Sequence, residues 1–213
     1  MKKNYKSKIV LSLATLLSSS PLVARSADSL GISLGLVGVA NIQSPSIEHN
    51  SASTSLDGQT TFGGGLTTEF YLQAGLSLEA DLLYLQHEFN QKTAEFFGSS
   101  ITSTFSSGHL QIPVLIRYRP IPFLSLGIGP YYSRVLTSWT VSASGQNSTT
   151  TNFGKNDYGA LAAVGTSIPI TGGLSAAADI RYTRSFSETA RSSGDAVKFS
   201  NLQIMAGLRF ETL

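Results

Sequence analysis

The chain has 213 residues, no cysteine and a formal net charge of +2. Without cysteine it can form no disulfide scaffold, thiolate nucleophile, cysteine-ligated metal site or lipidated N-terminal cysteine. Five of its fifteen basic residues lie within the first 25 positions; the remainder, with ten basic and thirteen acidic residues, has no Lys/Arg cluster suited to binding nucleic acid.

The N-terminal segment predicts a cleaved secretory signal peptide over residues 1–26. A basic head with four lysines precedes a short apolar run, Ile9 to Leu17, and Ala24-Arg25-Ser26 then forms an A-x-S cleavage pattern. This run is too short to span a bilayer, and no later run approaches the roughly 20 apolar residues that a membrane helix requires. If the predicted mature domain, residues 27–213, crosses a membrane, it must do so as closed β-structure, because hydrocarbon offers backbone polar groups no other partners.

Alternation of apolar with small or polar residues dominates the rest of the chain and predicts eight strands. In chain order, their apolar faces run from Leu30 to Leu36, Phe62 to Leu72, Leu76 to Tyr84, Leu110 to Tyr118, Leu124 to Ile128, Tyr158 to Ile168, Leu174 to Tyr182 and Leu202 to Phe210. The opposite faces carry glycine, serine and charged residues, and no stretch requires a helix.

The predicted connections alternate between long and short. The long ones are rich in Ser, Thr, Asn and Gly and cover about 43–58, 86–107, 136–156 and 184–198. The short ones are Leu72 to Gly75, Arg119 to Phe123 and Ile170 to Gly173. Outer-membrane barrels have short periplasmic turns and long extracellular loops. The order predicts an all-β, eight-stranded antiparallel up-and-down transmembrane β-barrel with both termini on the periplasmic side.

Aromatic residues near the predicted strand ends, among them Tyr71, Tyr131 and Tyr158, are expected to form girdles at the two membrane surfaces.

Two segments carry a resemblance to a known family. Leu110 to Tyr118 (LQIPVLIRY) and Leu126 to Tyr131 (LGIGPY) resemble a hairpin of the PorT-like outer-membrane β-barrel proteins, and the likeness extends more loosely over the mature chain. These barrels commonly end on an aromatic residue that the assembly machinery recognises, whereas here Glu211, Thr212 and Leu213 follow Phe210. The resemblance implies a fold and a location in the outer membrane of a Gram-negative-type bacterium, with no shared catalytic residues.

Charges on the non-apolar faces predict a polar lumen. If the apolar faces contact lipid, nine titratable residues point inward: Glu69, Glu79, Asp81, His109, Arg117, Arg119, Asp179, Arg181 and Arg209. An eight-stranded barrel is barely wide enough for its own side chains, and an unpaired charge there would cost several kcal/mol. We therefore expect a paired structural plug rather than a channel. Pro113 also points inward and predicts a bulge or locally broken pairing, because proline cannot donate to the ladder.

No catalytic, cofactor or metal site is predicted, but two other functional classes stay open. A lipid-modifying acyl hydrolase or transferase could use His87 with Glu88, or His109 with Ser106 and Ser107, because a base beside a hydroxyl and an acid is the minimum for acyl transfer. A narrow pore is the other class. A soluble lipocalin-like barrel would need the apolar and charged faces exchanged, which fits the sequence less well.

The expected role is structural or surface-interactive, without catalysis. We expect a monomer that contacts outer-membrane lipid and uses the barrel-assembly machinery during biogenesis, with no nucleic-acid partner. A surface partner would meet the long loops, which contain Trp139 and the run Ser148 to Thr151.

Overall fold

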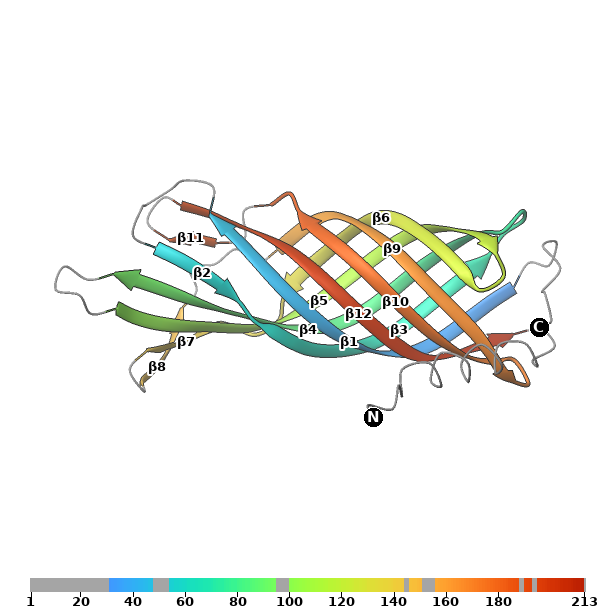
Figure 1. The fold of residues 1–213 in the computed structure, drawn as a ribbon. Coiled ribbons are helices and arrows are strands. Elements are labelled where there is room, and N and C mark those ends of the chain that lie inside the picture. The colour runs from blue at the N-terminus through green and yellow to red at the C-terminus, as the bar shows by residue number, and fades with distance from the viewer. Residues whose placement is uncertain are drawn as a thin grey trace, which may run out of the picture.

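The computed structural model describes residues 31–47, 54–94, 100–143, 146–150, 156–187, 190–192 and 195–212, and the predicted signal peptide lies outside them. The described part is built from β-strands (Figure 1). Among these residues there is no helix with the length and apolarity needed to cross a bilayer. The strands are β1 (Gly31–Ile47), β2 (Thr54–Gly58), β3 (Thr60–Tyr71), β4 (Leu76–Ala94), β5 (Ser100–Ile121), β6 (Leu124–Val135), β7 (Trp139–Ala143), β8 (Gln146–Thr150), β9 (Asn156–Thr171), β10 (Leu174–Ser185), β11 (Ala190–Ser192) and β12 (Asp195–Thr212).

Eight long antiparallel strands form a closed ring in the order β1, β3, β4, β5, β6, β9, β10 and β12. The ring closes where the first strand pairs with the last, from Ile32 opposite Thr212 to Ile47 opposite Val197. This closure leaves the ring without a free edge, as crossing a membrane with strands requires. The predicted all-β, eight-stranded antiparallel barrel is confirmed.

Side chains alternate between an apolar exterior and a polar interior. On β4, Leu78 and Leu82 are exposed, whereas Glu79 and Asp81 between them are buried. Phe62 on the outer face has an exposed fraction of 69%, whereas that of Arg181 on the inner face is 0%. A soluble lipocalin-like barrel requires the reverse arrangement.

Three tight turns lie at one end of the barrel, where β1 begins and β12 ends (Figure 1). They fall at residues 73–75, 122–123 and 172–173, as the sequence predicted. Positive φ angles occur at Ala74 (58°) and Gly75 (75°) in the first turn. In the third turn Gly172 and Gly173 have φ angles of 49° and 84°, a region that glycine enters at little cost. Both ends of the ring-forming chain therefore lie on the short-turn side.

The predicted long loops are wrong in extent, because strand structure continues far into them. β4 reaches Ala94 and β5 begins at Ser100, so most of the expected loop 86–107 is a hairpin. β2, β7, β8 and β11 occupy parts of the other three loops. The exposed face of β4 becomes polar at Gln86, which removes the apolar alternation that marks the strand nearer the turns.

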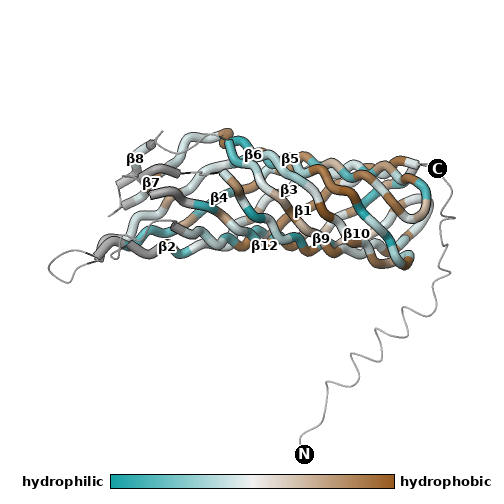
Figure 2. The backbone as a smooth tube through the Cα atoms, turned by 90° about the horizontal axis from the view of Figure 1, so that it is seen from above, coloured by the Kyte–Doolittle hydropathy of each residue, from teal (hydrophilic) through white to brown (hydrophobic). Residues whose placement is uncertain are grey.

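Hydropathy divides the barrel along its axis. Figure 2 shows hydrophobic residues concentrated in the half that carries the short turns, while the opposite end, with β2, β7 and β8, is mainly hydrophilic. A lipid-facing apolar band in such barrels is about 25 Å tall. The long strands therefore extend beyond this band on the side away from the chain ends.

Pro113 interrupts the sheet as predicted, by broken pairing and without a shift of register. β4 and β5 pair at Ala80 with Val114 and again at Leu83 with Gln111, but the two positions between them are unpaired.

The predicted aromatic girdle is wrong for Tyr71 and Tyr131. Tyr131 faces the lumen and is 4% exposed, and Tyr71 is half-buried and donates to Glu211 Oε1 at 3.2 Å. Both tyrosines occupy positions at which the side chains of their strands point toward the lumen. Other tyrosines, including Tyr118 and Tyr158, are exposed on the outer face.

Candidate functional site

The lower lumen, at the short-turn end, contains a dense network of ion pairs. Its members are four arginines and four carboxylates from five strands: Glu69 on β3, Glu79 and Asp81 on β4, Arg117 and Arg119 on β5, Asp179 and Arg181 on β10, and Arg209 on β12. Their formal charges sum to zero. Eight of the nine predicted lumen residues are thus brought together by strands that are far apart in sequence.

Arg181 is the centre of the network. Its guanidinium donates to Asp81 at 2.5 Å, to Glu79 at 2.8 Å and to Asp179 at 2.9 Å, and its side chain is fully buried. In the ring, β10 and β4 are separated by three strands on either side, so they face each other across the lumen. Arg181 therefore links diametrically opposite walls.

The remaining arginines link other walls to the same carboxylates. Arg117 contacts Glu79 at 2.9 Å and also pairs with Asp179. Arg209 contacts Glu69 at 2.6 Å and Glu79 at 2.7 Å. Because Glu79 receives hydrogen bonds from three guanidiniums, its burial costs far less than that of an isolated carboxylate.

Hydroxyl groups complete the network, and the sequence did not single them out. Ser77 donates to Glu69 and accepts from Arg119 at 3.0 Å, while Ser125 accepts from Arg117 at 2.9 Å. Both serines are buried on the inward face. Their position on that face was the available signal, but serine also occurs there simply because it is small.

Glycine provides the room that the long side chains need. A Cβ added at Gly165 would lie 1.9 Å from Oδ1 of Asp179, and one at Gly35 would lie 2.9 Å from Cγ of Arg209. Neither site can accept a larger side chain unless the network moves. The glycines on the inward faces of β1 and β9 are therefore part of how the network fits.

His109 does not belong to the charge network, contrary to the prediction. It lies eight residues from Arg117 along β5, which corresponds to about 26 Å of strand. Alternation correctly places it inside the barrel, but it cannot distinguish one level of the lumen from another. Two apolar clusters lie between the charge network and His109. One contains Val39, Leu83, Leu85 and Met205, and the other contains Leu115, Tyr131, Leu161 and Ala163.

The upper lumen contains a histidine pair beneath an aromatic cluster. The rings of His87 and His109 stack with their centroids 4.0 Å apart, and Ser107 Oγ lies 2.7 Å from His109 Nε2. The cluster above is formed by Phe89, Trp139 and Phe199, each 2% exposed. Leu56, Phe105 and Val135 pack against it. Trp139 is therefore buried inside the barrel and is not exposed on a surface loop, where a partner could contact it.

The candidate acyl-transfer groups are only partly assembled. Ser107 and His109 share the inward face, but Ser106 and Glu88 lie at the opposite phase of their strands, away from the histidines. Among the described residues, no carboxylate contacts either imidazole. The arrangement therefore provides a hydroxyl and a base without an acid to orient the base.

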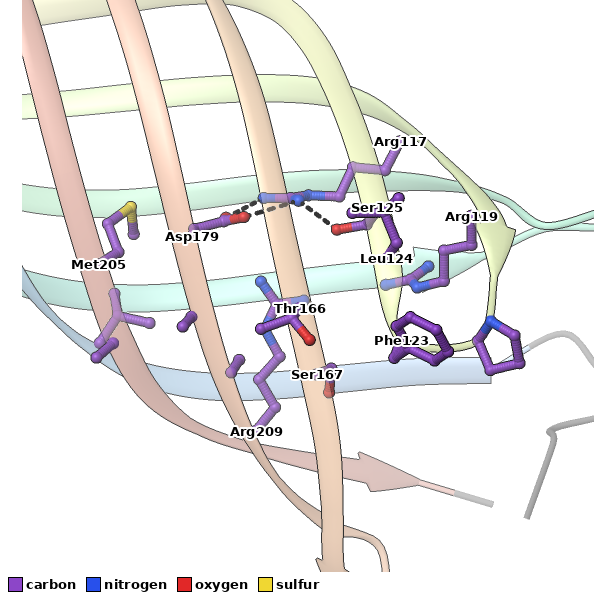
Figure 3. A pocket seen from close by; sticks show the side chains of 15 residues that line it. Arg117, Arg119, Phe123, Leu124, Ser125, Thr166, Ser167, Asp179, Met205 and Arg209 are labelled. Atoms are coloured by element: carbon purple, nitrogen blue, oxygen red, sulfur yellow. Dashed lines mark hydrogen bonds and ion pairs between the residues drawn. The ribbon is translucent and has the colours of Figure 1, made fainter. Parts of the chain in front are cut away.

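A small open cavity lies beside the charge network at the short-turn end (Figure 3). Arg117, Arg119, Arg209, Ser125 and Asp179 are among its lining residues. The cavity volume is about 20 Å³, enough for one or two waters. In the described part of the chain, Nε of Arg117 and Nε of Arg209 are buried without a hydrogen-bond partner. The cavity suits ordered water rather than an organic cofactor.

A closed antiparallel ring with an apolar exterior and paired charges inside defines the class of small membrane β-barrels. The chain matches the family described as outer membrane protein beta-barrel domain over residues 9–210. It belongs to this family.

Among the similar solved structures, that of OprG supports the same fold. OprG from Pseudomonas aeruginosa has a TM-score of 0.58 and 12% sequence identity, covering 88% of this chain and 99% of that chain. Neisserial surface protein A has a TM-score of 0.45 and 13% identity, covering 84% and 96%. Ail of Yersinia pestis has a TM-score of 0.43 and 16% identity, covering 85% and 97%. No curated protein matches the chain by sequence. At 12% identity the likeness to OprG shows the fold alone.

Proposed function

We propose that this outer-membrane β-barrel protein has a structural or surface-interaction role, with a sealed lumen and no catalysis. The observation that carries the proposal is the ion-pair network, in which Arg181 joins opposite walls and every carboxylate contacts at least one guanidinium. A conducting pore needs a continuous hydrated path. Instead, paired charges, two apolar clusters and the aromatic cluster succeed one another along the bore.

The extension beyond the apolar band supports a surface role. There β2, β4, β5, β7 and β8 pair side by side, so a rigid sheet rather than a set of loops would present the surface. Binding sites are often carried on segments that a rigid scaffold holds in place. The partner would therefore contact the outer face of this sheet or the segments at its tips.

The proposal also covers export and assembly. Residues 1–26 would act as the signal peptide, and the barrel-assembly machinery would insert residues 27–213 into the outer membrane of a Gram-negative-type bacterium as a monomer. The hairpin from Leu110 to Tyr131 supports placement among the PorT-like barrels. Its exterior would contact outer-membrane lipid.

Conductance across a planar lipid bilayer tests the sealed lumen. Protein that migrates as a folded barrel before boiling is added at increasing amounts, and we expect no stepwise current increase. Steady unitary currents from the same preparation would contradict the proposal and favour a narrow pore.

The contact between Ser107 and His109 keeps an acyl hydrolase or transferase as a second candidate. Both side chains are buried below the aromatic cluster, where a lipid substrate would first have to displace Phe89 and Trp139. Incubation with phospholipid or acyl-ester substrates should give no turnover. Turnover that disappears in both Ser107→Ala and His109→Ala would establish the enzyme instead.

A further inference from the structure

Two outward-facing arginines occupy equivalent places in a short repeated motif. Tyr132-Ser133-Arg134 lies on β6 and Tyr182-Thr183-Arg184 lies on β10. In each motif the middle residue is buried in the lumen, while the tyrosine and the arginine are exposed on the exterior. Within the described part of the chain, neither guanidinium has an ion pair or hydrogen bond.

Sheet register places the two arginines on either side of Tyr158. Arg134 pairs with Asn156 and Arg184 pairs with Ala160, so Tyr158 lies midway on the intervening strand, β9. Two strand spacings of about 4.8 Å and four residues of about 3.3 Å give roughly 16 Å between the two Cα atoms. Arginine side chains are long enough for both guanidiniums to approach one headgroup seated over Tyr158.

These residues lie near the upper edge of the apolar band, away from the chain ends, and exposed Leu136 and Phe186 follow the two arginines by two residues. Each arginine is two residues beyond an exposed tyrosine, and Ile128, Val164 and Ile180 are exposed on the same three strands nearer the short turns. Tyrosine is enriched where a membrane meets water. Below Tyr158, β9 presents Ala160 and Ala162, whose small side chains let an acyl chain lie close to the wall.

We propose that Arg134, Tyr158 and Arg184 bind a lipid of the outer leaflet that carries two phosphate groups. Guanidinium groups bind phosphate oxygens through paired, charge-assisted hydrogen bonds, and two separated guanidiniums favour a headgroup with two phosphates. On β4, by contrast, the exposed cation Lys92 is already paired with Asp57 at 2.6 Å. The inference rests on the proposed outer-membrane placement.

The test measures lipid binding to the folded full-length mature barrel in nonionic detergent by native mass spectrometry. The lipids are bisphosphorylated lipid A, the same lipid without phosphates, and phosphatidylglycerol. We expect the double variant Arg134→Gln/Arg184→Gln to bind bisphosphorylated lipid A about thirtyfold more weakly than wild type. The matched control Lys92→Gln should bind it as wild type does, and the dephosphorylated lipid should bind weakly to all three proteins.

Equal affinity of wild type and the double variant for bisphosphorylated lipid A would overturn the site. Equally tight binding of phosphatidylglycerol would also overturn it, because it would indicate general attraction to anionic lipid. Faster gel migration before boiling checks folding first, so failure of the membrane barrel itself is seen separately. If the double variant does not fold, each single variant should show about a fivefold loss, and an unchanged affinity in both would refute the proposal.

Discussion

Replacing Arg181 by methionine should destabilise the barrel strongly, because it leaves one carboxylate without a cation. Glu79 would keep Arg117 and Arg209, and Asp179 would keep Arg117, but the ion pair of Asp81 is with Arg181 alone among the described residues. Asp81 is 3% exposed, so water cannot replace the lost partner without entering the lumen. Stranding a buried charge typically costs about 3–5 kcal/mol.

A double-mutant cycle separates this effect from loss of packing. Urea unfolding of the barrel in phospholipid micelles is followed for Arg181→Met, Asp81→Asn and the double variant. Removing the stranded charge should recover much of the loss, with a coupling energy of about 2 kcal/mol. The control Lys92→Met, at an exposed ion pair, should change the free energy of unfolding by about 1 kcal/mol or less. A loss below about 1 kcal/mol for Arg181→Met, or no coupling with Asp81, would refute the reasoning.

Two further predictions concern space in the lumen. Gly165→Ala should lower the free energy of unfolding by about 1–3 kcal/mol, because the added Cβ would collide with Oδ1 of Asp179. The control Gly38→Ala, whose added Cβ has its nearest contact at 3.9 Å, should leave the free energy of unfolding almost unchanged. Equal effects of the two substitutions in urea unfolding would contradict this prediction. Trp139 is the chain's single tryptophan and is buried, so its fluorescence should resist acrylamide quenching, and Phe89→Ala should increase quenching. Strong quenching in the wild type would show that the aromatic cluster is open.

The sequence predicted the ring and the inward faces because lipid outside and polar groups inside impose a period of two. On β4, for example, successive side chains point to opposite faces of the strand, so the sequence alone places Leu78 outside and Glu79 and Asp81 inside. Pairing partners could not be predicted in the same way. The cross-lumen contact of Arg181 with Glu79 depends on strand order and shear, which place residues 102 positions apart at one level.

The sequence did not predict the aromatic cluster of the upper lumen, because there the apolar side chains move from the outer face of the strands to the inner face. Up to Tyr84 the outward-facing residues of β4 are apolar, but beyond it Gln86 faces outward and Phe89 faces inward, as in a water-exposed sheet. A search for one continuous outward apolar face therefore ends at Tyr84 and assigns the later residues of β4 to a loop. The change of phase itself was a usable signal for the aromatic cluster around Phe89 and Trp139.

Heat modifiability combined with fractionation tests the central claim most directly. The full precursor is expressed, outer membranes are isolated, and gel migration is compared before and after boiling. The account predicts faster migration of the unboiled protein in the outer-membrane fraction, because a closed ring of eight paired strands resists detergent at room temperature. A soluble periplasmic protein whose migration is unchanged by boiling would contradict it.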